Sequence, residues 1–249
     1  MADRVVIVGD SHLGPNNRAD EPSFHQFLAA VPELGDRLIL MGDLFEFWFG
    51  YRRAIPRDSF KTMAGLARVV ERGVKAEMFG GNHDRWAGGR DSFWASDLGI
   101  PFHTDGADLT LAGRKTWVHH GDGLAEAKLS SKVMHRVTRN PITIALFRAI
   151  HPDFGFKLTD KLATVLSQAN KTAEAMDASA AKQERFARSV LDRRPELSLV
   201  LLAHTHRQRL VEHAPGRFYL NAGQWMSERH YAVVSAGAIW VGAWPSHPA

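Results

Sequence analysis

Short apolar runs separated by polar clusters form the main pattern along this chain of 249 residues. Eight runs have the length and composition of strands, at 5–8, 37–41, 76–79, 115–119, 197–202, 217–220, 232–235 and 238–241. Several are apolar at every position, which is typical of strands covered on both faces. Residues 23–31 and 60–72 instead carry apolar side chains at helical spacing. Strand and helix alternation predicts an α/β layered domain, and the closing strands, with no helix between them, predict a mixed sheet or a second sheet.

A long helical stretch interrupts this alternation. It runs over 126–194 and is broken at Asn140-Pro141 and at 151–155. We interpret 126–194 as a helical insertion, or lid, within a single domain of residues 1–249. The alternative is an ordinary set of helices packed on one sheet.

Five polar clusters follow apolar runs, at the points where strands should end. They are Asp10-Ser11-His12, Gly42-Asp43, Gly81-Asn82-His83-Asp84, His119-His120-Gly121-Asp122 and His204-Thr205-His206. Loops at strand ends can bring side chains to one point, because the sheet fixes where each loop begins. These carboxylates, imidazoles and one carboxamide suit two divalent metals about 3.5–4 Å apart, a recurring arrangement for hydrolysing phosphate esters.

The residue types suggest how the ligands divide. Asp43 is the candidate bridge between the two metals, since Gly42 lets the backbone turn sharply just before it. Asp10 and His12 are two residues apart, so in an extended segment they would face the same way. Asn82 would supply a neutral oxygen. Mixed oxygen and imidazole ligands suit Mn, Fe or Zn, and we expect two ions with Mn preferred.

Composition and charge narrow the picture further. The chain has no cysteine, which excludes disulfides and thiolate metal sites. It has no apolar run of about 18 residues, and we expect neither a membrane span nor an export signal. The net charge is only +4, but residues 125–171 hold eight Lys/Arg and three acids. This basic segment favours an anionic partner such as a lipid surface or a charged substrate, with a solvated helix face as the alternative.

The order of the clusters resembles the calcineurin-like metallophosphoesterases. The match runs from Val5 to about Trp225, with Ala203 where the family usually has Gly. The resemblance implies a four-layer α/β/β/α sandwich, that is, a double β-sandwich flanked by helices. It also implies which side chains hold each metal, including the choice of His120 over His119 as the histidine directly before Gly. The implied ligands are Asp10, His12, Asp43 and His206 for the first metal and Asp43, Asn82, His120 and His204 for the second.

Two further residues of the third cluster have catalytic roles in this interpretation. His83, beside Asn82, is placed to donate a proton or a hydrogen bond to the reacting phosphate or the leaving group. Asp84 is expected to orient His83 and fix its tautomer.

Within that superfamily, several short segments of this chain are similar in residue sequence to the UDP-2,3-diacylglucosamine diphosphatases of lipid A synthesis. The stretches that carry this likeness are 43–50, 120–122, 170–177, 204–207 and 221–225. The likeness implies hydrolysis to UMP and a lipid 1-phosphate, a lid that holds acyl chains, and substrate contacts by Asp122, Asn170 and Lys171. It also implies a cytoplasmic enzyme, peripheral at the inner membrane through an anionic surface, with no nucleic-acid partner.

Some residues depart from that branch. Some of these diphosphatases have Arg at the position of His83. This chain also has Gln208 at a position where the diphosphatases usually have Pro. The alternatives are therefore a related phosphoesterase acting on another phosphodiester, nucleotide or phosphoprotein, and a metal-bearing scaffold without turnover.

Overall fold

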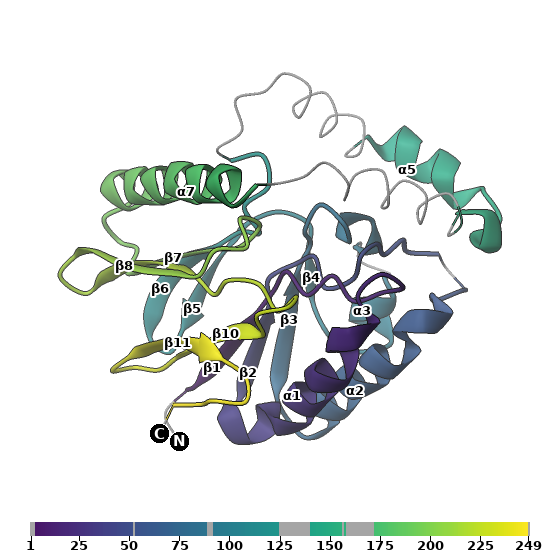
Figure 1. The fold of residues 1–249 in the computed structure, drawn as a ribbon, viewed down its shortest axis with the longest axis horizontal. Coiled ribbons are helices and arrows are strands. Elements are labelled where there is room, and N and C mark those ends of the chain that lie inside the picture. Colours follow the sequence, from purple (N-terminus) through teal and green to yellow (C-terminus); the bar gives the residue numbers. More distant parts are fainter. Residues whose placement is uncertain are drawn as a thin grey trace.

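Two β-sheets stacked face to face, with helices on both outer faces, make up the protein in this computed structural model (Figure 1). The structure describes residues 3–51, 53–88, 92–124, 140–155, 157 and 172–248. The arrangement confirms the expected four-layer α/β/β/α sandwich.

The first sheet has six strands in the order β11-β10-β1-β2-β3-β4. Their bounds are β1 Val5–Val8, β2 Arg37–Leu40, β3 Lys75–Phe79, β4 Phe102–His103, β10 His230–Val234 and β11 Ile239–Ala243. Strands β1 to β4 are parallel, and β10 and β11 each run antiparallel to their neighbour. The helices α1 (Glu21–Leu34), α2 (Phe60–Glu71) and α3 (Phe93–Ser96) connect the parallel strands. This is the strand–helix alternation that the sequence predicts.

The second sheet has five strands in the order β5-β6-β7-β9-β8. Their bounds are β5 Ala107–Leu111, β6 Arg114–Val118, β7 Leu199–Leu202, β8 Arg209–Ala214 and β9 Arg217–Asn221. The apolar runs did not predict β4, β5 and β8. Strand β4 has only two residues, and β5 and β8 are edge strands in which half-buried residues alternate with exposed ones, without a continuous apolar run.

Alternate residues of the central strands pack against different layers. In β1, Val6 and Val8 join the apolar cluster beneath α1 and α2, whereas Val5 and Ile7 join the cluster between the sheets. Strand β7 alternates in the same way between the other sheet and the helix α7 (Ala173–Arg193). A continuous apolar run is therefore needed here because each face of the strand is covered by a different layer.

The predicted insertion is only partly described. Its last helix, α7, lies on the outer face of the second sheet (Figure 1), with Ala187 and Leu191 fully buried, so this helix belongs to the sandwich. Helix α5 (Pro141–Arg148) begins at the predicted break, where the Asn140 side chain accepts a hydrogen bond from Ile142 N at 2.8 Å. The predicted substrate residues Asn170 and Lys171 lie outside the described residues, and the extent of the insertion and the domain bounds stay predictions. Among the helices that the structure describes, none is long and apolar enough to cross a membrane.

Replacing Ile7 by Ala should lower the free energy of unfolding by about 2–5 kcal/mol, because it leaves a cavity between the two sheets. Ile7 is fully buried, on a strand with neighbours on both sides. Urea unfolding followed by circular dichroism measures the loss. Leu210→Ala, on the edge strand β8 with 37% of Leu210 exposed, should cost much less; equal losses would contradict this assignment of the core.

Candidate metal centre

Six imidazole and carboxylate side chains predicted as ligands meet at the ends of the strands. Three groups have ligand atoms within 4.8 Å of one another: Asp10 with His12 and His206, His12 with Asp43 and His83, and Asp43 with His120 and His204. The first and third groups share no residue, and the second group connects them because it contains His12 of the first and Asp43 of the third. Asp43 Oδ2 is 3.8 Å from His12 Nε2 and 3.4 Å from His120 Nε2. The arrangement is that of two adjacent donor sets around one carboxylate.

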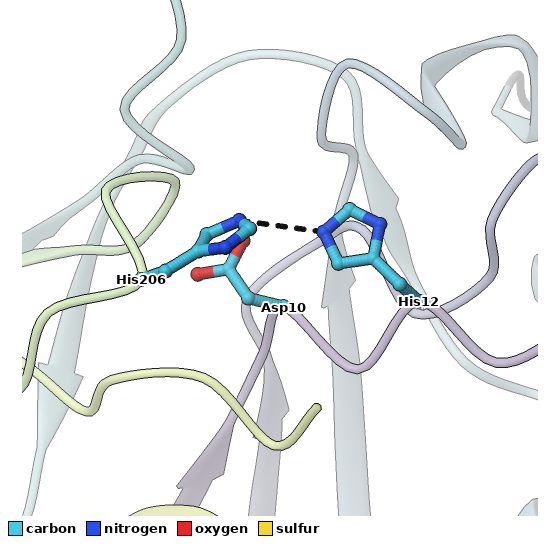
Figure 2. A group of neighbouring side chains, drawn as sticks. All are labelled: Asp10, His12 and His206. Atoms are coloured by element: carbon cyan, nitrogen blue, oxygen red, sulfur yellow. Dashed lines mark hydrogen bonds and ion pairs between the residues drawn. The ribbon is translucent and has the colours of Figure 1, made fainter. Parts of the chain in front are cut away.

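The first set comes from two loops that are far apart in the sequence. Figure 2 shows Asp10, His12 and His206 pointing toward one place. His12 Nε2 and His206 Nε2 are 3.4 Å apart, and His206 Nε2 is 3.5 Å from Asp10 Oδ1. The backbone N–H of His204 donates to Asp10 Oδ2 at 2.9 Å, which ties the two loops together.

Five of the predicted ligands have a left-handed backbone, which the sequence did not reveal. The φ angles are +49° at Asp10, +44° at His12, +50° at Asp43, +72° at His204 and +60° at His206. The extended segments expected around Asp10 and His12 are therefore wrong, although the side chains do converge. Asp and His are among the residue types that tolerate positive φ.

Two glycines allow the loops to approach closely. A Cβ on Gly42, whose φ is +91°, would lie 2.6 Å from Gly81 N and 2.7 Å from His120 Nδ1. A Cβ on Gly81 would collide with the carboxylate of Asp43. Glycine is therefore required at both positions by the contact between ligand loops, and Gly42 also by its turn.

The structure distinguishes the two neighbouring histidines. His120 is buried, and its Nδ1 donates to the Met41 carbonyl at 2.7 Å, so Nε2 is left to face Asp43. His119 has other partners: its Nδ1 accepts from Gly121 N at 2.8 Å, and its ring lies 5.7 Å from that of Trp117. Only His120 joins the donor sets.

The expected pair between Asp84 and His83 is wrong. The buried Asp84 carboxylate accepts from the backbone N–H of Gly81 at 2.7 Å and of Leu44 at 2.9 Å. Burial and the nearby Asp43 charge raise the pKa of Asp84 to about 6. Asp84 therefore fixes the loops on either side of the centre and does not contact the imidazole.

His83 is instead oriented by backbone contacts. Its Nδ1 donates to the Glu46 carbonyl at 2.6 Å, since a carbonyl can only accept. Its own backbone N–H donates to Asp43 Oδ1 at 2.8 Å, and its ring lies edge-on to His12 at 4.7 Å. These contacts place the imidazole at the edge of the centre and leave Nε2 for other partners.

Asn82 and Asp122 differ in what the structure shows of them. Asn82 is exposed and lies between two residues that contact Asp43, so its role as a ligand stays a prediction. Asp122 is only 1% exposed and forms an ion pair with Arg85 at 3.3 Å, which argues against a direct substrate contact. Burial opposes its ionisation, but the charges of His120 and Arg85 lower the pKa of Asp122 to about 2. Arg85 was not predicted from the sequence, although it directly follows the third cluster.

The electrostatics of the centre favour a cation. Burial disfavours a charged imidazole, yet the adjacent Asp43 raises the pKa of His120 to about 10. Burial likewise opposes ionisation of Asp43, but His120, His83 and His12 hold its pKa well below the usual range. Within the described residues, His120 Nε2 makes no hydrogen bond. The buried Asp43 carboxylate favours a positive charge beside it, and a divalent ion would supply that charge once His120 Nε2 is deprotonated. The donor set therefore fits the metals expected from the sequence.

Comparison with known proteins agrees with this geometry. The family model for calcineurin-like phosphoesterases matches residues 3–208. This chain belongs to that family. It is a metal-dependent hydrolase.

Two similar curated proteins are named UDP-2,3-diacylglucosamine hydrolase. That of Porphyromonas gingivalis is 29% identical, over 94% of this chain and 94% of its own length. That of Edwardsiella ictaluri is 28% identical, over 98% and 93%. An archaeal phosphodiesterase of known structure aligns with a TM-score of 0.45 at 12% identity, over 96% of this chain and 98% of that one.

Replacing His120 by Ala should lower the amount of bound metal, because His120 Nε2 faces Asp43 at 3.4 Å. His119→Ala should leave metal content unchanged, since His119 belongs to none of the three donor groups and its Nδ1 accepts from Gly121 N. Metal content after gel filtration, measured by inductively coupled plasma mass spectrometry, tests both. The reverse pattern would assign the wrong histidine.

Proposed function

We propose that this protein hydrolyses the pyrophosphate bond of UDP-2,3-diacylglucosamine to UMP and 2,3-diacylglucosamine 1-phosphate. The reaction adds water at the α-phosphorus and breaks its bond to the bridging oxygen, so the lipid keeps the β-phosphate. The observation that carries the chemistry is the joining of two donor sets through Asp43. The substrate is supported by full-length similarity to proteins named for it.

In this proposal the two donor sets hold two divalent ions, with Mn preferred and Fe or Zn as alternatives. The first would be held by Asp10, His12, Asp43 and His206, and the second by Asp43, Asn82, His120 and His204. When bound, the ions supply an activated water and neutralise negative charge that develops on the phosphoryl group. Burial of Asp10, Asp43 and His120 limits competing water and strengthens these interactions.

His83 is the proposed acid or hydrogen-bond donor of the chain. Its Nδ1 is occupied by the Glu46 carbonyl, so the protonated ring presents Nε2–H toward the space beside Asp43 and His12. A donor there can stabilise charge on a phosphoryl oxygen or on the leaving phosphate. Asp84 acts only through the loops that it holds.

The described part of the insertion supports a lipid substrate. Phe147 of α5 contacts Phe49 at 4.5 Å and Trp86 at 5.3 Å between ring centroids, and Trp86 follows His83 by three residues. On α5, Ile142 and Leu146 are one turn apart and are 69% and 67% exposed. Exposed apolar side chains on a helix that packs against the residues following Asp43 and His83 fit acyl chains.

We also propose that the enzyme meets its substrate at an anionic membrane surface as a peripheral protein. The basic excess over residues 125–171 and the exposed apolar side chains of α5 support this. Such contact would be weak and reversible, and it requires no membrane-spanning helix.

The direct test is hydrolysis of UDP-2,3-diacylglucosamine with added Mn²⁺, with release of UMP followed by chromatography. A matched reaction uses the deacylated UDP-sugar, which should react poorly because each buried CH₂ that is lost costs about 0.8 kcal/mol. Equal rates for the two substrates would contradict a lipid-specific enzyme. Hydrolysis of generic diesters alone would favour a related phosphoesterase.

His83→Gln should lower kcat by roughly 10²–10⁴, the usual contribution of general acid–base catalysis. Metal content should be unchanged, because His83 is not among the proposed ligands. Parallel measurement of kcat and metal content checks this, and loss of metal would make His83 a ligand.

Replacing both Ile142 and Leu146 by Ser should raise KM for the diacylated substrate by about tenfold or more, since each side chain can contribute about 1.5 kcal/mol or more when it is covered by an acyl chain. Hydrolysis of a small diester should be unaffected. Leu210→Ser, an exposed apolar residue on β8, is the matched control and should leave both activities unchanged. An unaltered KM in the double variant would separate α5 from acyl binding.

A further inference from the structure

A buried glutamine on α7 makes a hydrogen-bonded network next to the metal centre. Gln183 is 1% exposed. Its Oε1 accepts from Tyr219 OH at 2.7 Å, from Asn221 Nδ2 at 3.1 Å and from Thr205 Oγ1 at 3.3 Å. All four of these residues are buried. Helix α7 is thereby joined to β9 and to the loop that carries the last two histidines.

The other side of the same amide faces the residues beside two proposed ligands. Gln183 Nε2 donates to the Ala203 carbonyl at 2.8 Å, directly before His204. A Cβ on Gly121, directly after His120, would lie 2.5 Å from the same Nε2. One side chain therefore hydrogen-bonds the backbone next to His204 and packs closely against the backbone next to His120, the two imidazoles proposed for the second metal.

The network also holds the residue between the two histidines of the loop. Asn221 Nδ2 donates to Ala203 O at 3.2 Å and to Thr205 Oγ1 at 3.1 Å, and Asn221 Oδ1 accepts from Gly223 N at 2.9 Å. Since His204 and His206 both have positive φ, their conformation depends on such outside contacts. A fully paired buried network is well suited to fixing one backbone arrangement.

We propose that Gln183 is a positioning residue for the second metal, acting through the backbone next to His120 and His204. It does not touch the proposed ligand atoms. The inference rests on the proposed two-metal centre, and it adds a residue in a helix that carries no ligand. The first metal should depend on Gln183 less, because three of its four proposed ligands, Asp10, His12 and Asp43, lie on loops that the amide does not contact. Only His206 lies on the loop that Gln183 holds.

The test is Mn²⁺ titration by isothermal calorimetry of the wild-type protein and of Gln183→Met, which keeps the side-chain length and removes both hydrogen-bonding atoms. The wild type should bind two equivalents. In the variant one site should keep its affinity and the other should weaken by about 10–100-fold, the usual effect of removing an outer hydrogen-bond partner. Gln183→Glu retains the acceptor but, when ionised, cannot donate to Ala203 O, and it should weaken the same site.

Electron paramagnetic resonance identifies which metal is lost. With one equivalent of Mn²⁺, Gln183→Met should give the spectrum of His120→Ala, which lacks a ligand of the second metal, rather than that of His12→Ala, which lacks a ligand of the first. A match to His12→Ala would overturn the assignment.

Two controls separate positioning from loss of stability. Val190→Ala removes a buried contact of α7 that belongs to the cluster on β7 and β9, and it should lower Tm while leaving both metal sites intact. Asp177→Asn breaks the exposed ion pair between α7 and Arg207, and it should change neither Tm nor the affinity of the metal sites. Wild-type affinity at both sites in Gln183→Met, or equal weakening in Val190→Ala at matched Tm, would overturn the proposal. Fewer than two metals in the wild type would instead refute the two-metal centre, and the role of Gln183 with it.

Discussion

Left-handed backbone at the strand ends is the constraint on which the metal centre depends. Five ligand candidates adopt it, and each non-glycine residue held this way costs on the order of 1–3 kcal/mol. The cost is offset by hydrogen bonds between the loops themselves. The backbone N–H groups of Ser11 and His12 both donate to the Asp43 carbonyl, at 3.0 and 2.9 Å, and Asp10 N donates to Gly42 O at 3.0 Å. The two loops that carry most of the first donor set therefore hold each other in shape.

These loops bring imidazoles and carboxylates close together, and the protein chain alone does not balance their charges and protons well. His12 Nε2 and His206 Nε2 face each other at 3.4 Å, so at most one of them can carry a proton between the rings. Asp43 is nearly fully buried among imidazoles. A cation held by each donor set would supply the positive charge that these carboxylates and imidazoles favour. Metal binding should therefore stabilise the strained loops, and the loops in turn preorganise the site for the metal.

The parts of this structure that follow from local pattern could be predicted from the sequence. Continuous apolar runs identified the central strands, because each of their faces packs on a separate layer. The ligand types were visible because Asp and His follow those runs directly. The partner of His83 could not be predicted: an adjacent Asp84 suggested a pair, but the turn directs that carboxylate to Gly81 N and Leu44 N. Gln183 had no local signal either, since its partners are 20 to 38 residues away.

Two helices, α7 and α5, pack next to the loops of the metal centre. The backbone beside His120 and His204 is backed by α7, whose apolar side is buried on the second sheet and whose Gln183 amide is buried. The loops after Asp43 and His83 are instead covered by α5, through Phe147 against Phe49 and Trp86 and through Arg148 Nε, which donates to Gly50 O at 3.1 Å. Only a few residues separate these contacts from Asp43 and His83. A substrate that packs against α5 would therefore contact the elements next to the loops of Asp43 and His83, whereas the backbone beside His120 and His204 is held by the buried side of α7.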